Sequence, residues 1–135
     1  MTTRMLLSGF LTLAGCGSMY SQQAEPPPKP VGLYEQYAPG LLARKAYTAD
    51  PVGKYSVELW DLLVGPGMKN EGATLPGGAV IEVRSGSGDA VIDGKSQKIK
   101  IGSVFSVAEG VKFSLINSDK ENPLSMRAVV IRTRQ

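Results

Sequence analysis

The side chains that carry most enzyme chemistry are scarce in this sequence. Its 135 residues include no histidine and one cysteine, so it has no Ser-His-Asp or Cys-His relay and no imidazole metal ligand. Carboxylates remain, and the candidates for acid–base catalysis are Asp61, Glu71 and Glu82. Strand alternation directs Glu82 outward and Glu71 lies near a turn, so a converging acid–base pair is not indicated. We therefore expect no catalytic residues and a protein that is not an enzyme.

The single cysteine stands where a covalent modification is expected. Residues 1–16 read MTTRMLLSGFLTLAGC, in which Arg4 precedes an apolar run, 5–13, too short to span a hydrocarbon core that needs about 20 residues. The last four letters, LAGC, resemble the lipobox of bacterial lipoprotein precursors. The resemblance implies that residues 1–15 are a removable signal peptide and that Cys16 carries acyl chains such as palmitate. An ordinary secretory leader with an incidental cysteine is the alternative.

The residues after Cys16 predict an anchored tether. In lipoproteins an aspartate after the cysteine favours retention at the inner membrane, so Gly17 favours the outer membrane, with the protein facing the periplasm. Residues 16–50 begin as a proline-rich spacer, in which three consecutive prolines, 26–28, favour extended geometry. Segment 33–47 is too apolar for a pure spacer. We expect it to pack across the folded domain as a short helix or an added strand, and a partner-docking peptide is the alternative.

From residue 51 to residue 135 the sequence predicts one all-β domain. Short apolar and β-branched runs are separated by Gly, Pro, Asn and Asp at spacings of about ten residues, which is typical of a sandwich or barrel. The Asp93-Gly94 dipeptide predicts a hairpin turn. The expected strands are 55–64, 70–75, 79–84, 88–93, 97–101, 104–107, 111–117 and 125–133. Eight short strands predict a small antiparallel jelly-roll barrel.

Two glycine-framed stretches carry a family resemblance. Residues 102–117, GSVFSVAEGVKFSLIN, resemble the second motif of the cupin superfamily in its glycines and its final Asn117, whereas Phe113 stands in place of the histidine. The first motif is present in outline between Gly67 and Gly86. Its positions for the two histidines are occupied by Ala73 and Leu75, and its position for the glutamate is occupied, with one residue of slip, by Ala79.

The resemblance implies an RmlC-like jelly roll that lacks the metal ligands of its relatives. All four ligand positions are apolar, so the metal-dependent activities of the family do not carry over, and no metal or cofactor is expected. Alternation around these positions defines the expected barrel interior. That interior is formed by Ala73, Leu75, Ala79, Ile81, Val83, Phe113 and Leu115. It is either a packed core or a dry pocket for an apolar ligand.

Charge and composition restrict the classes of partner that this protein is expected to bind. The formal charge is +3, and the only tight basic cluster, Lys95, Lys98 and Lys100, is explained by a solvated hairpin edge, which argues against nucleic acid. We expect a non-catalytic, lipid-anchored, cupin-like envelope protein that acts as a protein-binding or assembly module. The alternative is a barrel that binds a small apolar ligand without a metal. The resemblance also implies a tendency to pair through sheet edges, as in a homodimer.

Overall fold

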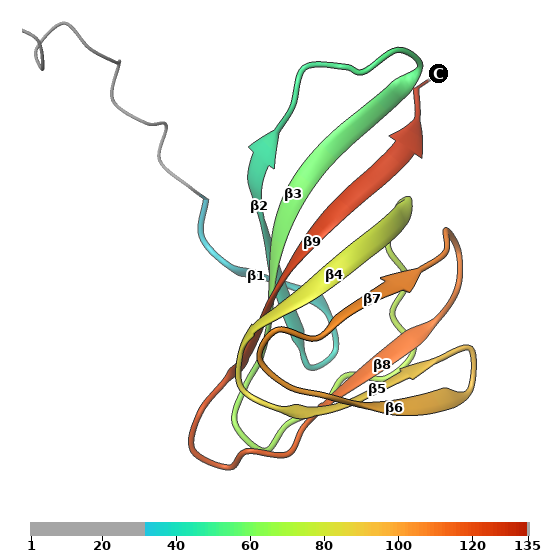
Figure 1. Cartoon of the computed structure of the whole chain (residues 1–135). Helices are drawn as coiled ribbons and strands as arrows, with labels where there is room; N and C mark the ends of the chain where they lie inside the picture. Colours follow the sequence, from blue (N-terminus) through green and yellow to red (C-terminus); the bar gives the residue numbers. More distant parts are fainter. Residues whose placement is uncertain (1–31, 135) are drawn as a thin grey trace, which may run out of the picture. The chain divides into compact units, whose positions relative to one another are not determined.

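The computed structural model describes residues 32–134, and their regular structure consists of β-strands (Figure 1). The predicted signal peptide, the lipidation site Cys16 and the prolines of the tether lie outside the described residues. No helix in the described part of the chain is long and apolar enough to cross a membrane. The expected all-β class is therefore confirmed for this part of the chain.

The strands form two antiparallel sheets. The larger sheet has six strands in the order β1-β2-β3-β9-β4-β7, and the smaller sheet has the order β6-β5-β8. The strands of the larger sheet are β1 (Glu35–Ala38), β2 (Leu41–Thr48), β3 (Tyr55–Val64), β9 (Leu124–Thr133), β4 (Gly78–Ser85) and β7 (Val104–Val107). Those of the smaller sheet are β5 (Gly88–Ile92), β6 (Lys95–Ile99) and β8 (Phe113–Asn117).

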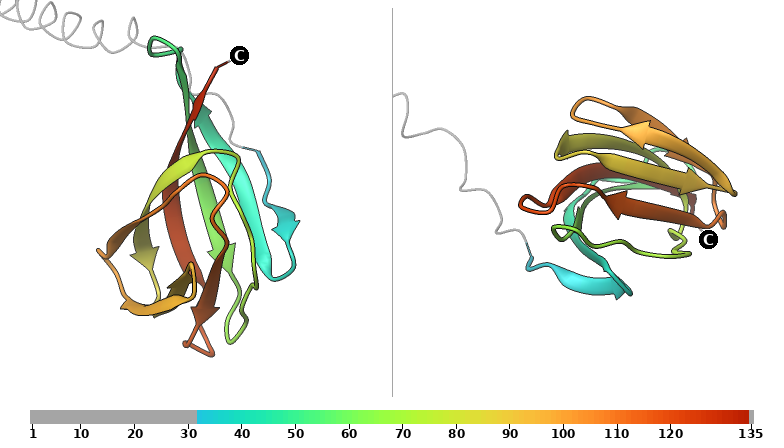
Figure 2. Two further views of the ribbon diagram at one scale, coloured as in Figure 1. Left: turned by 90° about the vertical axis from the view of Figure 1, so that its right-hand side faces the viewer. Right: turned by 90° about the horizontal axis from the view of Figure 1, so that it is seen from below.

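The two sheets pack face to face as the layers of a jelly roll. Figure 2 shows the layers from two further sides, and Figure 1 shows that β2, β3 and β9 extend beyond the smaller sheet. Strands β3 and β9 pair over ten residues without irregularity, from Tyr55 opposite Thr133 to Val64 opposite Leu124. Successive side chains of a strand point to opposite faces, and one cluster of buried apolar side chains from both sheets fills the space between them.

The predicted hairpin at Asp93-Gly94 is confirmed. Both residues have positive φ, 52° and 79°, as the tight turn between β5 and β6 requires. Strand β6, which carries Lys95 and Lys98, is the edge strand of the smaller sheet, and Lys98 pairs with Asp89 of β5 at 3.5 Å. The basic cluster is thus a hairpin edge, as the sequence predicts.

Two segments differ from the strand prediction. Segment 33–47 contributes β1 and most of β2, and β2 pairs with β3 along its length, so the larger sheet begins before residue 51. Residues 70–75, in contrast, form no strand: Ala73 makes an isolated bridge to β8, as does Lys69 just before the segment. The run is interrupted because Gly72 takes a φ of 67°, which a regular strand does not accommodate.

Candidate functional site

The positions that correspond to cupin ligands lie within the core. Ala73 and Phe113 face each other across a β-bridge, in which the N–H of each donates to the carbonyl of the other at 3.0 and 2.9 Å. Leu75 and Ala79 belong to the same cluster of buried side chains. The structure therefore brings the two motif regions together in space.

All seven side chains expected in the barrel interior are buried. Their exposed fractions do not exceed 5%, and Phe113 is among the largest fully buried side chains. The buried members are Ala73, Leu75, Ala79, Ile81, Val83, Phe113 and Leu115. These residues do not fit a metal ion, because hydrocarbon side chains supply no donor atom. Within residues 32–134, no three Cys, Asp or Glu side chains gather where they could share a metal ion.

Asn117, the last residue of the second motif, has a structural task. Its side chain is 3% exposed, and its amide nitrogen donates to the carbonyls of Val64, Gly65 and Asn122 at 3.2, 3.0 and 2.9 Å. Its amide oxygen accepts the N–H of Asp119 at 2.9 Å. One buried amide thus joins the end of β3 to the loop between β8 and β9. Asparagine suits this position because its side chain supplies both the donor and the acceptor that these buried backbone groups need.

Asn70 is a second buried amide, and the sequence analysis missed it. It is 1% exposed, and its side-chain oxygen accepts the backbone N–H of Leu115 at 2.8 Å. The side chain therefore supplies a ladder bond where the chain around Gly72 leaves strand geometry. The available signal was an asparagine inside a run interpreted as a strand, since this residue type is depleted in strands.

A polar cluster lies on β2, β3 and β9, on the face of the larger sheet that also faces the core. The carboxylate of Glu58 is buried, accepts a hydrogen bond from Trp60 Nε1 at 3.1 Å, and lies 3.4 Å from Lys45 Nζ and 3.6 Å from Arg132. The ring of Tyr37 stands edge-on to that of Trp60 at 5.3 Å. Sequence reasoning missed this cluster, although strand alternation gives Glu58 and Trp60 the same face.

An open groove of about 360 Å³ adjoins this cluster. It is lined by Gly32, Leu33, Glu35, Gln36, Tyr37, Ala43, Arg44, Lys45 and Trp60. The lining residues come from β1, β2 and β3 and from the residues before β1. The groove lies outside the barrel interior predicted from the motifs, because none of the seven interior residues lines it.

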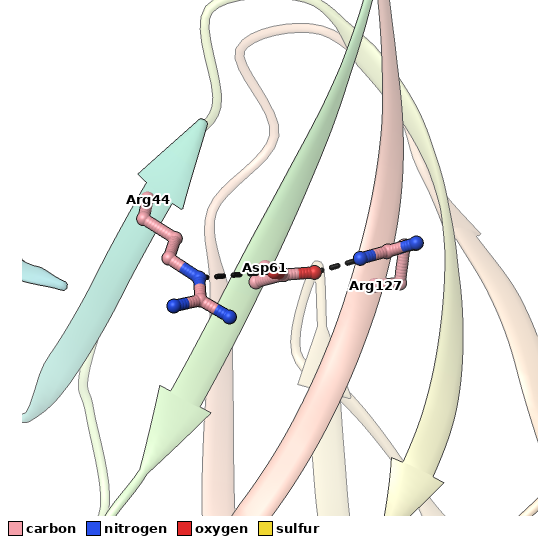
Figure 3. Close-up of polar contacts among 3 residues, drawn as sticks. All are labelled: Arg44, Asp61 and Arg127. Atoms are coloured by element: carbon pink, nitrogen blue, oxygen red, sulfur yellow. Dashed lines mark hydrogen bonds and ion pairs between the residues drawn. The ribbon is translucent and has the colours of Figure 1, made fainter. Parts of the chain in front are cut away.

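An ion triad occupies the opposite face of the larger sheet. Asp61 of β3 lies between Arg44 of β2 and Arg127 of β9, whose Nε atoms donate to its two oxygens at 3.0 and 2.9 Å (Figure 3). The pKa of Asp61 lies below its ordinary value. Burial by itself raises this pKa, and the hydrogen bonds from Arg127 and Arg44 outweigh the effect of burial. Asp61 is thus a structural carboxylate whose negative charge is balanced by two arginines. A lowered pKa is the opposite of what a general acid requires.

The three carboxylates considered for acid–base work do not converge. Glu71 pairs with Lys69 at 3.1 Å in the loop before β4, and Glu82 is exposed on β4. In the register of the sheet Glu82 and Asp61 both lie opposite Arg127, so they stand two strand spacings, about 10 Å, apart. That separation exceeds the reach of a direct proton transfer between them.

The outer face of the larger sheet also exposes apolar side chains. Tyr47, Val80 and Ile131 are 59%, 46% and 40% exposed. They surround Leu59 and Val129, which are half-buried and lie opposite each other in the β3–β9 pair. Neighbouring positions of the same strands point into the core. This face therefore carries a group of neighbouring exposed apolar side chains.

Comparison with known proteins places the fold. A cupin-2 domain from Rhodospirillum rubrum superposes with a TM-score of 0.61 and 15% identity over 83% of this chain and 76% of that one. An RmlC-like cupin from Shewanella frigidimarina superposes with a TM-score of 0.56 and 14% identity over 76% and 86%. No family model and no curated protein matches the sequence. The chain has the cupin fold, and the expected jelly roll is confirmed.

A third similar structure corrects one expectation. Salicylate 1,2-dioxygenase from Pseudaminobacter salicylatoxidans superposes with a TM-score of 0.56 and 20% identity over 73% of this chain. This chain spans only 31% of the length of that enzyme. The expectation that the protein is not an enzyme is wrong as an inference from fold and composition, because the same fold carries a dioxygenase. Fold alone does not decide between catalysis and binding, and the missing histidines remove only imidazole chemistry.

Proposed function

We propose that this chain is a lipid-anchored, cupin-fold protein of the bacterial cell envelope that binds a protein partner in an envelope assembly. One observation supports the binding role: Tyr47, Val80 and Ile131 leave an apolar surface on the outer face of the larger sheet. The interior positions are buried and apolar, so recognition falls to the surface. The anchor rests on the LAGC sequence that ends at Cys16.

The anchor is tested by the variant Cys16→Ala. We expect the parent to incorporate labelled palmitate and to sediment with membranes, because acyl chains contribute about 0.8 kcal/mol per buried methylene. The variant should incorporate no label and should remain uncleaved or become soluble. Ser18→Ala, which keeps the cysteine, is the control and should behave as the parent. A Cys16→Ala protein that is cleaved and sediments like the parent would exclude the anchor.

The outer membrane is the proposed location, on the basis of Gly17. Density-gradient separation of the membranes should place the parent in the outer-membrane fraction. The variant Gly17→Asp should move to the inner-membrane fraction, because aspartate after the modified cysteine favours retention there. If parent and variant both remain in the inner-membrane fraction, the proposed location is incorrect while the anchor itself stands.

Partner binding is tested by photo-cross-linking in intact cells. A photoreactive amino acid at position 80, on the outer face, should give a discrete adduct. The same group at position 101, where Ile101 is 67% exposed in the turn between β6 and β7, should not. Adduct formation should also fall when Ile131→Arg is introduced beside position 80, because a charge in an apolar interface weakens it. Equal labelling from both positions would contradict a specific binding face.

Binding of a small apolar or aromatic ligand is a second candidate. It is favoured by the groove of about 360 Å³ beside Trp60, a volume within the range of ligand sites. Trp60 is the only tryptophan, so its fluorescence reports directly on this groove. Titration with indole should shift or quench the emission, and Tyr37→Ala should weaken the effect. Unchanged emission up to millimolar indole would remove the groove from consideration.

A further inference from the structure

The turn between β2 and β3 is an ordered structure at one end of the larger sheet. Val52 and Tyr55 pair across it, and the N–H of each donates to the carbonyl of the other at 3.0 Å. Arg134, the last described residue, donates its backbone N–H to the carbonyl of Lys54 at 2.7 Å and a guanidinium N–H to that of Gly53 at 3.3 Å. Figure 1 shows this turn beside the C-terminal end of β9. We call residues 51–55 together with Arg134 the hairpin tip.

The hairpin tip presents apolar side chains to solvent. Val52 and Tyr55 are 62% and 42% exposed, and Pro51 is exposed beside them. Because Val52 and Tyr55 are a cross-strand pair, their side chains lie on the same side of the turn. Transfer of this pair from water into an apolar phase is therefore favourable.

The exposed charge of the hairpin tip is mainly positive. Lys54 and Arg134 are both exposed. The Lys54 Nζ lies 5.5 Å from the centre of the Tyr55 ring, which is a cation–π distance. Within segment 49–57, Asp50 is the one carboxylate. Two cations thus stand at the tip against one anion.

This combination of side chains matches the chemistry of a phospholipid surface. Tyrosine is favoured at the boundary between membrane and water, and apolar side chains enter the edge of the acyl region. Lysine and arginine are attracted to anionic headgroups. A specific protein partner typically covers about 20 to 30 residues on each side, which is far more than the hairpin tip contains. A membrane surface has no such requirement.

We propose that the hairpin tip contacts a membrane surface that contains anionic phospholipids. Val52 and Tyr55 enter the interface, while Lys54 and Arg134 lie at the level of the phosphates. The inference goes beyond the proposed function, which places a protein partner on the outer face of the sheet. It rests on that function in one respect, because the anchor at Cys16 keeps the domain near a bilayer.

The length of the chain permits the anchor and the hairpin tip to lie at the same membrane. The Arg44 guanidinium lies 4.4 Å from the centre of the Tyr34 ring, and Arg44 is opposite Asp61 of β3. Asp61 and Tyr55 are about 20 Å apart along this strand. The chain from Cys16 to Tyr34 spans up to about 60 Å when fully extended, which exceeds that distance.

Quenching of tryptophan by brominated phospholipids tests the contact in the full, acylated chain reconstituted into vesicles. Trp60 is 6% exposed, so the emission of the parent should be the same with ordinary and with brominated lipid. Val52→Trp adds a second tryptophan at the hairpin tip. Brominated phosphatidylglycerol should remove about half of the emission of this variant, because one of its two indole rings lies in the interface.

Ile101→Trp is the matched control for position. Ile101 is 67% exposed and lines a groove together with Ser85. Ser85 lies opposite Ser125 near the start of β9, whereas Tyr55 lies opposite Thr133 near its end. Ser125 and Thr133 are about 25 Å apart along the strand. The control should therefore show no quenching beyond that of the parent.

A second pair of variants tests the role of charge. In the Val52→Trp protein, Lys54→Gln should lower the ratio of bound to free tip about fivefold in phosphatidylglycerol vesicles. Vesicles of brominated phosphatidylcholine alone should also reduce the quenching. Lys98→Gln, which removes the same charge from a 92% exposed side chain on β6, should have no effect.

The possible outcomes separate this inference from the proposed function. A Val52→Trp protein that floats with the vesicles but is not quenched would overturn the tip contact and leave the anchor intact. Equal quenching from positions 52 and 101 would also overturn it, since the contact would then not be specific to the tip. Quenching that ignores both lipid charge and Lys54→Gln would contradict anionic phospholipid as the partner. A chain that does not float with the vesicles would contradict both the anchor and the tip contact.

Discussion

Asp61 and Arg127, which lie 66 residues apart in the chain, are joined by a hydrogen bond of 2.9 Å across the β3–β9 pair. Arg44 completes the contact from the other side at 3.0 Å. Three strands of the larger sheet are thus connected on their outer face by one carboxylate. The pairing accounts for the tolerance of a charged group among the half-buried apolar side chains of this face.

Substitution of this carboxylate should lower the stability of the domain. We expect Asp61→Asn to reduce the free energy of unfolding by about 2 kcal/mol, because two charge-assisted hydrogen bonds are weakened and two arginines lose their counter-charge. The measurement is chemical denaturation. Asp89→Asn, which removes a pair with the 92% exposed Lys98 side chain, is the matched control and should cost less than about 0.5 kcal/mol. Equal losses would mean that the triad is no stronger than a surface pair.

The contribution of Asp61 should also depend on pH. Its pKa in the folded protein lies below the ordinary value, whereas in the unfolded chain it is about 3.9. A lowered pKa contributes stability that is fully present above the unfolded value and is lost as the pH falls through the folded value. The difference in unfolding free energy between parent and Asp61→Asn should be constant above about pH 5 and should narrow below about pH 4. A constant difference down to pH 3 would contradict the lowered pKa.

The sequence predicted the strands wherever one face is buried and the other is polar. Strands β3 and β7 begin and end at the predicted residues, 55–64 and 104–107. The alternation around Ile81 and Val83 also placed Glu82 outward, as the structure has it. In such strands the hydrophobic period fixes which residues face the core, so a single sequence is sufficient.

The first two strands could not be assigned from this period. In β2 the side chains near Leu42 and Tyr47 contribute to an apolar outer face, and a bulge between Lys45 and Tyr47 shifts the register. A sheet that is apolar on both faces loses the alternation that reveals a strand. The same property hid the exposed apolar side chains of the outer face, because Tyr47, Val80 and Ile131 come together only when β2, β4 and β9 lie in one sheet.

The polar groups of the core were beyond sequence reasoning for a different reason. The partners of Asn70 are backbone atoms of Phe113 and Leu115, more than 40 residues away. Such a contact follows from tertiary packing and leaves no local pattern. Asn117 was singled out only because it ends a recognisable motif. The glycine frame therefore predicted the fold, while the hydrogen bonds within the frame emerged from the structure.

Two glycines of the cupin frame permit a matched test of close packing. Gly86 and Gly102 have the same φ of 89°, so alanine at either position incurs the left-handed strain of about 1 to 2 kcal/mol. A Cβ on Gly86 would lie 2.7 Å from the carbonyl oxygen of Pro123, whereas a Cβ on Gly102 would meet nothing within 4 Å. We expect Gly86→Ala to cost about 1 to 3 kcal/mol more than Gly102→Ala in chemical denaturation. Equal costs would show that the backbone around Gly86 and Pro123 shifts to accept the added methyl group without further loss of stability.

Truncation of Phe113 tests whether this ring fills the barrel. It is 1% exposed and lies among the buried side chains of both sheets. Phe113→Ala should lower the free energy of unfolding by about 3 to 5 kcal/mol, from lost transfer energy and the cavity left behind. Val104→Ala, at a position that is 61% exposed, is the control and should stay within about 0.5 kcal/mol of the parent. The two variants are compared by denaturation at one pH.

Phe113→His gives the sharper result, because it reintroduces the side chain that the cupin motif places there. Its immediate neighbours in the frame, Ala73, Leu75 and Ala79, offer no second donor, and tight metal sites use about three or four ligands. We expect no zinc to be retained after dialysis against a chelator. The imidazole should also destabilise the domain, because a polar ring is buried without a designed partner. Stability equal to that of the parent, or retained stoichiometric zinc, would show that the space around position 113 holds polar groups or water rather than a packed hydrocarbon core.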